Sequence, residues 1–272
     1  MRSLRGYTFV LALAVAMPAA IAQEAPQPEA TTKLAERISV RAKEFMVASA
    51  HPLATSAGYS VLEAGGTAAD AAVAVQAMLG LVEPQSSGLG GGAFALYWDA
   101  ALGELTTYDA RETAPLAADE KYWLGEDGAP VEFIAAVVGG RSAGVPGTPK
   151  LMETLHGKFG RLPWSGLLQP AIDTAEQGFA VSQRLADAIP EAPGLDTFET
   201  TRSYFFDAAG SPLAEGATLE NPAYARTLRL VADQGAAPFY TGQIARDIVA
   251  AVRTEPNPGL LTMEDFARYE VV

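Results

Sequence analysis

The chain has 272 residues, of which 49% are hydrophobic and 19% are charged, and it carries a formal net charge of −13. This composition is typical of a folded protein with one large domain or two small ones, and it excludes fibrous and mostly disordered chains. The acidic residues are spread along the sequence without a basic stripe, so we expect neither nucleic-acid binding nor attachment to an anionic membrane surface.

Residues 1–22 are predicted to form an export signal peptide. Two arginines precede an apolar run over residues 9–16, which is too short to span a bilayer as a permanent helix. The small residues Ala20 and Ala22 suit a signal peptidase, so we expect cleavage after Ala22. A permanent N-terminal membrane anchor is the alternative. The prediction is an exported protein, periplasmic or secreted, with no membrane attachment after cleavage.

The predicted elements begin after a flexible leader over residues 23–32. No linker or repeat divides the chain beyond it, so residues 33–272 are interpreted as one domain. The apolar run 45–50 is predicted to be a buried strand. Residues 52–64 are predicted to form a helix, which the pair Gly65-Gly66 ends because glycine readily adopts the left-handed conformation at a helix terminus.

A second helix is predicted to start at Thr67. Thr67 and Asp70 have the spacing of a capping box, in which each side chain accepts a hydrogen bond from a backbone N–H. The following residues are apolar on nearly every face as far as Val82, and Pro84 ends the helix. We expect this helix inside the protein, because its length and the polar residues Asp70 and Gln76 exclude a membrane span.

A glycine-rich loop over residues 85–92 leads into a predicted antiparallel hairpin with strands 93–98 and 104–110. A further strand is predicted over residues 133–138. The rest is predicted to be mainly helical, with candidate helices over residues 149–158, 165–177, 182–189, 222–234, 243–253 and 262–269. The last four residues have the pattern of the start of a strand, so we expect that the domain continues past this point.

The glycine-rich loop contains GLGGGA, which fits the nucleotide-binding pattern G-x-G-x-x-A. That fingerprint binds phosphate when a strand precedes it and a helix follows, and here the predicted order is the reverse. Close approach of two backbones, which only glycine permits, is the better interpretation. The residues assigned to this structural glycine loop are Gly88, Gly90, Gly91 and Gly92.

The segment GRSAG around Ser142 matches the nucleophile-elbow pattern G-x-S-x-G. An elbow needs a helix directly after the serine, and residues 145–147 (VPG) interrupt any helix there, so a serine hydrolase is the weaker interpretation. The sequence has no cysteine and two histidines, His51 and His156. It therefore predicts no thiol nucleophile, no disulfide and no metal site. No cofactor is expected either, since the glycine loop does not have the element order of a nucleotide site.

Arg111 and Glu112 are predicted to lie where the second hairpin strand leaves the sheet, in the segment DARETAP. A guanidinium matches a carboxylate because its two parallel N–H groups face the two oxygens. Arg111 is therefore a candidate carboxylate-binding residue. An ordinary surface ion pair between Arg111 and Glu112 or Asp109 is the alternative, and the spacing alone does not decide between them.

These motifs together resemble the γ-glutamyltranspeptidase family. The likeness covers nearly the whole chain after residue 45 in the right order, and the pairing of EPQSSGLGGG with RETAP is specific. The matching segments are residues 46–98, DARETAP (109–115), GVPGT (144–148), LLQPAIDTAEQGF (167–179), PFYTGQIA (238–245) and LTMEDFARYE (261–270).

The resemblance implies an α+β fold, the N-terminal-nucleophile hydrolase sandwich with two sheets between two helical layers. Family members are made as a precursor that cuts itself into a large and a small subunit. The new N-terminal threonine attacks a γ-glutamyl amide, usually glutathione, with its own α-amine as the base. Arg111 is similar to the family's arginine that binds the α-carboxylate of the glutamyl group, and Glu112 is expected to support it.

None of the Thr-Thr pairs in this sequence matches the family's nucleophile motif. The resemblance therefore implies that the chain covers part of the large subunit, that no catalytic residue lies within it, that the sandwich is incomplete and that the chain alone is inactive. Two alternatives remain open. One is an acylase of the same superfamily acting on glutaryl-type side chains of β-lactam compounds, and the other is a non-catalytic exported binding protein.

Overall fold

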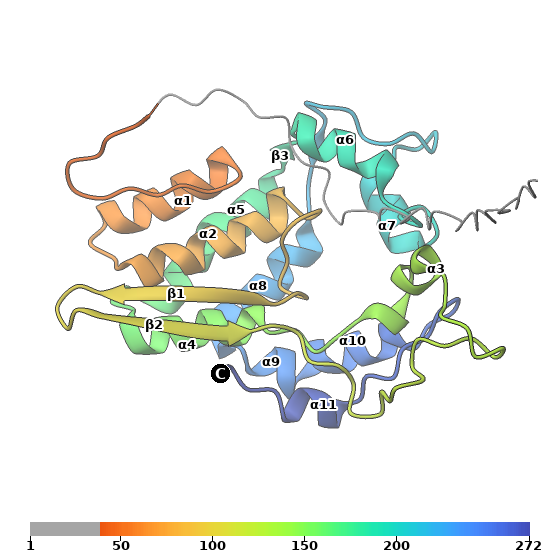
Figure 1. Cartoon of the computed structure of the whole chain (residues 1–272). Coiled ribbons are helices and arrows are strands. Elements are labelled where there is room, and N and C mark those ends of the chain that lie inside the picture. The colour runs from red at the N-terminus through yellow and green to blue at the C-terminus, as the bar shows by residue number, and fades with distance from the viewer. Residues whose placement is uncertain (1–38) are drawn as a thin grey trace, which may run out of the picture. The chain divides into compact units, whose positions relative to one another are not determined.

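The structure, a computed structural model, describes residues 39–272 (Figure 1). The predicted signal peptide (1–22) and the predicted leader (23–32) lie outside the described residues. Residues 41–272 form one compact unit. Among the described residues, no helix has both the length and the apolar character needed to cross a membrane.

This unit is mixed α and β, with more helices than strands. Its α-helices are α1 (Pro52–Glu63), α2 (Ala68–Val82), α3 (Phe133–Val137), α4 (Thr148–Phe159), α5 (Trp164–Gln177), α6 (Gln183–Glu191), α7 (Glu199–Phe205), α8 (Pro222–Gln234), α9 (Ala237–Tyr240), α10 (Gln243–Val252) and α11 (Met263–Ala267). Its strands are β1 (Ala93–Asp99), β2 (Glu104–Ala110), β3 (Phe179–Ala180) and β4 (Thr218–Leu219), and a 3-10 helix covers Gly140–Ser142. Every predicted helix is confirmed to within two residues at each end, whereas α3, α7, α9 and the β3–β4 pair were not predicted.

Helix α2 lies among the other helices and contacts α1, α4 and α5 (Figure 1). The side chain of Thr67 accepts from the N–H of Asp70 and the carboxylate of Asp70 accepts from the N–H of Thr67, which confirms the predicted capping box. Val73, Leu81 and Val82 are each at most 1% exposed. The helix is apolar on nearly every face because neighbouring helices cover most of its circumference.

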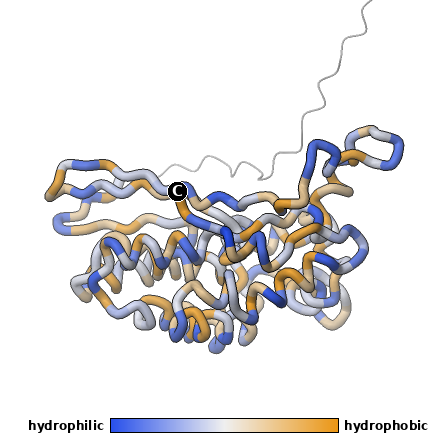
Figure 2. The backbone as a smooth tube through the Cα atoms, turned by 90° about the horizontal axis from the view of Figure 1, so that it is seen from below, coloured by the Kyte–Doolittle hydropathy of each residue, from blue (hydrophilic) through white to orange (hydrophobic). Residues whose placement is uncertain are grey.

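The β1–β2 hairpin covers α4 with one face and leaves its other face open. On the covered face, Tyr97 stacks on Phe159 of α4 at 3.8 Å between ring centroids, and Tyr108 meets the same ring edge-on. Side chains alternate along a strand, so the residues between point to the opposite face. Three large apolar side chains there are at least 60% exposed: Phe94, Leu96 and Trp98. Figure 2 shows the strands as a layer over the helices.

The strand predicted over residues 45–50 is wrong. The segment is extended, but it pairs with no strand among the described residues. Its apolar side chains pack on α1 instead, where the ring of Phe45 lies 5.1 Å from that of Tyr59 and Val47 faces Gly58. A short apolar run indicates burial but not the kind of neighbour, and here a helix rather than a sheet covers these side chains.

The strand predicted over residues 133–138 is also wrong, because residues 133–137 form the short helix α3. The N–H of Ala136 donates to the carbonyl of Glu132 at 2.9 Å, as in a helical turn. None of the five residues is buried. Within residues 39–272 no strand lies beside them to form a ladder, so the local turn satisfies their backbone groups instead.

The last residues run from α11 back to the hairpin. The N–H of Asp109 donates to the carbonyl of Val272 at 2.7 Å, and the N–H of Val272 donates to the carbonyl of Asp109 at 2.9 Å. This exchange of two bonds is the hydrogen-bonded pair of antiparallel strands. Val272 therefore pairs with Asp109 of β2, whereas residues 269–272 form no strand in the structure.

Candidate functional site

Arg111 lies directly after the last residue of β2, where the hairpin opens into two adjoining cavities. Its side chain is 64% exposed and lines both cavities, which have volumes of about 650 and about 490 Å³. The larger cavity continues past Glu112 to Tyr122, Trp123 and Arg141. A guanidinium in this position presents free N–H groups to a space large enough for a small organic anion.

Glu112 connects Arg111 with the glycine loop. Its Oε1 accepts a hydrogen bond from the N–H of Gly92 at 2.8 Å, and its Oε2 lies 3.5 Å from the Nε of Arg111. Within the described residues this buried Oε2 makes no hydrogen bond. The pair that the sequence placed side by side is therefore in contact, and Arg111 keeps most of its donors free.

The glycine loop is fixed to the first turn of α4. The carbonyl of Gly91 accepts three hydrogen bonds, from the N–H of Gly147 at 2.9 Å and from the N–H and Oγ1 of Thr148, both at 3.0 Å. A Cβ at Gly92 would lie 2.6 Å from the carbonyl oxygen of Ala110. Close backbone approach therefore requires glycine at position 92, as the sequence interpretation expects for the loop.

The other glycines of the predicted loop have more room. A Cβ at Gly90 would have no atom within 4 Å, and a Cβ at Gly88 would meet its nearest atom at 3.9 Å. Gly88 lines the smaller cavity and Gly90 lines both cavities. At these two positions the small residue keeps the cavity open, whereas at Gly92 it lets two chain segments touch.

An ion pair that sequence reasoning missed fixes the start of this loop. Glu83 is 2% exposed and pairs with Arg184 of α6, which also donates to Ser86 Oγ at 2.9 Å. Farther along, the side chain of Gln76 donates to Ser87 Oγ at 2.8 Å. Arg184 follows Glu83 by 101 residues, so no local pattern could have indicated the pair.

Ser142 and His156, the residues that a serine hydrolase would need, have separate partners. Ser142 Oγ donates to the carbonyl of Val137 at 2.8 Å, and its segment is a 3-10 turn that follows α3 rather than a strand. His156 Nε2 lies 2.9 Å from the carbonyl of Leu162. The G-x-S-x-G match is therefore not a nucleophile elbow.

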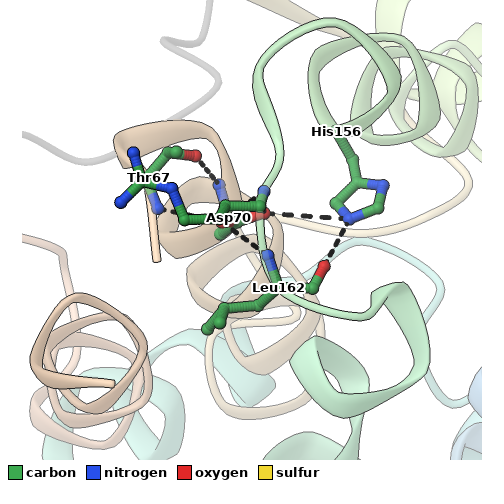
Figure 3. A network of polar contacts seen from close by, with 5 residues as sticks. Thr67, Asp70, His156 and Leu162 are labelled. Carbon is green, nitrogen blue, oxygen red and sulfur yellow. Dashed lines mark hydrogen bonds and ion pairs between the residues drawn. The ribbon is translucent and has the colours of Figure 1, made fainter. Parts of the chain in front are cut away.

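His156 belongs to a polar network around the buried Asp70 (Figure 3). The Asp70 carboxylate accepts from the N–H groups of Thr67, Arg161 and Leu162 at 2.8, 2.9 and 3.2 Å, and His156 Nε2 lies 3.7 Å away. Burial opposes ionisation of Asp70, but these backbone donors outweigh it and hold its pKa below the usual value. The network joins the start of α2 to the loop after α4.

Among residues 39–272, no group of three or more His, Cys, Asp or Glu residues could hold a metal ion. The exposed guanidinium of Arg111, which lines both cavities beside a hydrogen-bonded glycine loop and a half-buried carboxylate, suits recognition of an anion.

Comparison with known proteins relates this chain to one family. Residues 54–272 match the family model described as gamma-glutamyltranspeptidase. The glutathione hydrolase proenzymes of Bacillus subtilis (strain 168) and Escherichia coli (strain K12) are each 37% identical to this chain, over 229 and 235 residues. These matches cover 84% and 86% of this chain but only 38% and 40% of the relatives. The chain thus spans about two fifths of the length of these relatives.

The chain is also similar to solved structures. The γ-glutamyltranspeptidase of Helicobacter pylori is 37% identical with a TM-score of 0.80, over 86% of this chain and 66% of that one. A cephalosporin acylase from Bacillus halodurans is 31% identical with a TM-score of 0.72, over 90% of this chain and 46% of that one.

Proposed function

The chain belongs to the γ-glutamyltranspeptidase family, and we propose that it forms the carboxylate-binding part of an exported glutathione hydrolase. The observation that carries the proposal is Arg111, whose 64% exposed side chain lines both cavities at the end of β2. Glutathione and other γ-glutamyl amides end in an α-carboxylate, which a guanidinium binds through two parallel hydrogen bonds.

Glu112 supports Arg111 in this proposal. The oxygen that accepts from Gly92 fixes the carboxyl group, and the other oxygen forms an ion pair with the Nε of Arg111 at 3.5 Å. In this proposal the Nη groups bind the substrate carboxylate. An ion pair with a glutamate that Gly92 fixes limits the rotamers of the arginine, so less conformational entropy is lost when substrate binds.

The nucleophile in this proposal lies outside the 272 residues, and the αββα sandwich of which residues 41–272 form a part is completed there as well. The nucleophile is the N-terminal threonine of a small subunit, which is released when the precursor cuts itself. Its hydroxyl attacks the γ-glutamyl carbonyl while its own α-amine accepts the proton. The amine of the leaving group departs, and water or an amino acid then takes the γ-glutamyl group from the threonine oxygen. Residues 1–272 by themselves should show no turnover.

The test is steady-state hydrolysis of a γ-glutamyl anilide by the protein expressed from its complete gene. Replacing Arg111 by Ala should lower kcat/KM by about 100-fold, or about 2.7 kcal/mol, chiefly through KM, because the bidentate pair is lost. Arg111→Lys should recover only part of this loss, since an ammonium group lacks the planar fork. Arg226→Ala, an exposed arginine of α8, is the control. An unchanged KM in Arg111→Ala would refute the assignment.

A second candidate function is suggested by the 31% identity to a cephalosporin acylase. A glutaryl amide carries its carboxylate at the same distance from the amide carbon as a γ-glutamyl amide and lacks only the α-amino group. Arg111 could therefore serve either substrate. Comparison of glutaryl anilide with γ-glutamyl anilide separates the two functions, and faster hydrolysis of the glutaryl compound would favour the acylase.

A further inference from the structure

The backbone at Arg111 has lost its strand partner. The last pair of the hairpin joins Ala93 to Ala110, so the N–H and the carbonyl of Arg111 receive no bonds from β1. Side chains hold them instead. The N–H of Arg111 donates to Oδ1 of Asp109 at 2.9 Å, and its carbonyl accepts from the hydroxyl of Tyr269 at 2.9 Å.

Tyr269 reaches this carbonyl from the far end of the chain, 158 residues later. It is 6% exposed, and its ring stacks on that of Tyr240 at 5.6 Å with an interplanar angle of 18°. Burial, with the charges of Asp109 and Glu112 nearby, raises the pKa of Tyr269 to about 12. The hydroxyl is therefore protonated and able to donate at any physiological pH.

The space around the Tyr269 hydroxyl is closely filled. A Cβ at Gly147 would lie 2.1 Å from this hydroxyl oxygen and 1.9 Å from the carbonyl oxygen of Ala110. Two residues before Gly147, the N–H of Val145 donates to the carbonyl of Thr113 at 2.9 Å. Gly147, the Tyr269 hydroxyl and the carbonyl of Ala110 are thus packed closely together, and the peptide of Arg111 has little freedom to rotate while the bond from Tyr269 is present.

Rotation of this peptide would move the guanidinium, because an arginine side chain extends several ångströms from its Cα. A misplacement of about 1 Å at a group that orients substrate can cost about 100-fold in rate. Loss of one hydroxyl leaves the rest of the packing in place, so a smaller displacement and a smaller effect are expected.

We propose that Tyr269 is a positioning residue for Arg111, acting through the backbone carbonyl to set where the guanidinium meets the substrate carboxylate. The inference rests on the proposed role of Arg111. Tyr240 provides a matched comparison within the same stack. Its hydroxyl donates to the carbonyl of Pro146 at 2.8 Å and accepts from the N–H of Lys150 at 3.2 Å, so it makes similar buried bonds without touching Arg111.

The experiment compares Tyr269→Phe with Tyr240→Phe in the protein expressed from its complete gene. Each variant is assayed with γ-glutamyl anilide and with 4-aminobutyryl anilide, which has the same chain and amine but no α-carboxylate. Tyr269→Phe should lower kcat/KM for the γ-glutamyl compound by about 10-fold, chiefly through KM, and leave the carboxylate-free compound within about twofold. Tyr240→Phe should change both compounds equally or not at all.

A double variant distinguishes positioning from general damage. If Tyr269 acts through Arg111, adding Tyr269→Phe to Arg111→Ala should cost nothing further on either compound. If Tyr269→Phe fails to fold, Asp109→Ala removes the other backbone contact of Arg111 at an exposed position and should produce the same selective loss.

Equal losses on both compounds in Tyr269→Phe would overturn the inference. If that variant does not fold, unchanged selectivity in Asp109→Ala would overturn it. A wild-type protein that does not hydrolyse γ-glutamyl anilide would overturn the proposed function itself. A loss of activity in Arg111→Ala together with unchanged activity in Tyr269→Phe would overturn only the role of Tyr269.

Discussion

Replacement of Asp70 by asparagine should destabilise the protein although it alters only one atom of the side chain. Asp70 is fully buried. Its Oδ2 accepts from the N–H groups of Thr67, Arg161 and Leu162, and its Oδ1 accepts a second, longer bond from the N–H of Arg161 at 3.2 Å. An asparagine oxygen can occupy the same place, but as a neutral acceptor. The change therefore removes the charge from the three hydrogen bonds to Oδ2 without opening a cavity.

The expected loss follows from those three bonds. A hydrogen bond to a charged group contributes about 1 kcal/mol more than one between neutral groups, so Asp70→Asn should lower the free energy of unfolding by about 3 kcal/mol. For a chain of this size that corresponds to a fall in Tm of roughly 8 °C. Asp233→Asn, at an exposed position on α8, should change Tm by no more than about 1 °C.

Thermal unfolding followed by circular dichroism at neutral pH measures both variants. The pKa of Asp70 is held below its usual value of 3.8 in the folded protein, so its contribution is complete above that value and is lost as the pH falls through the lower folded pKa. The difference in Tm between wild type and Asp70→Asn should therefore shrink in acid. A difference no larger than that of Asp233→Asn at neutral pH, or one that grows in acid, would refute the reasoning.

Two further changes test close packing and buried charge. Gly147→Ala should cost at least about 2 kcal/mol of unfolding free energy, because its Cβ would lie 1.9 Å from the carbonyl oxygen of Ala110. Gly157→Ala on α4, whose Cβ would meet no atom within 4 Å, should stabilise the folded protein by about 0.5–1 kcal/mol. Urea denaturation of both variants measures the difference, and equal effects on the free energy of unfolding would contradict the prediction. Glu83→Gln should cost about 1–2 kcal/mol by weakening a buried ion pair. Glu199→Gln, in an exposed pair, should change stability by less than about 0.5 kcal/mol, and a similar loss in both would contradict the importance of burial.

Short-range patterns were sufficient for most of the helices and for the hairpin. Thr67 with Asp70 marked the start of α2 by a spacing of three residues, and the structure has both bonds of that capping box. Residues 45–50 and 133–138 were wrongly predicted to be strands, because a run of apolar residues does not indicate whether a sheet or a helix packs against it. A strand exists only where another segment completes its ladder, and that partner is a tertiary property.

The sequence by itself determined the family, the run of helices and the pairing of Arg111 with Glu112, because these depend on residues close together along the chain. Only the tertiary structure placed Arg111 between two cavities, paired Glu83 with Arg184 and brought Tyr269 to the Arg111 carbonyl. Contacts across 101 and 158 residues depend on how the helices pack, and packing is a sum over many side chains that no local pattern contains.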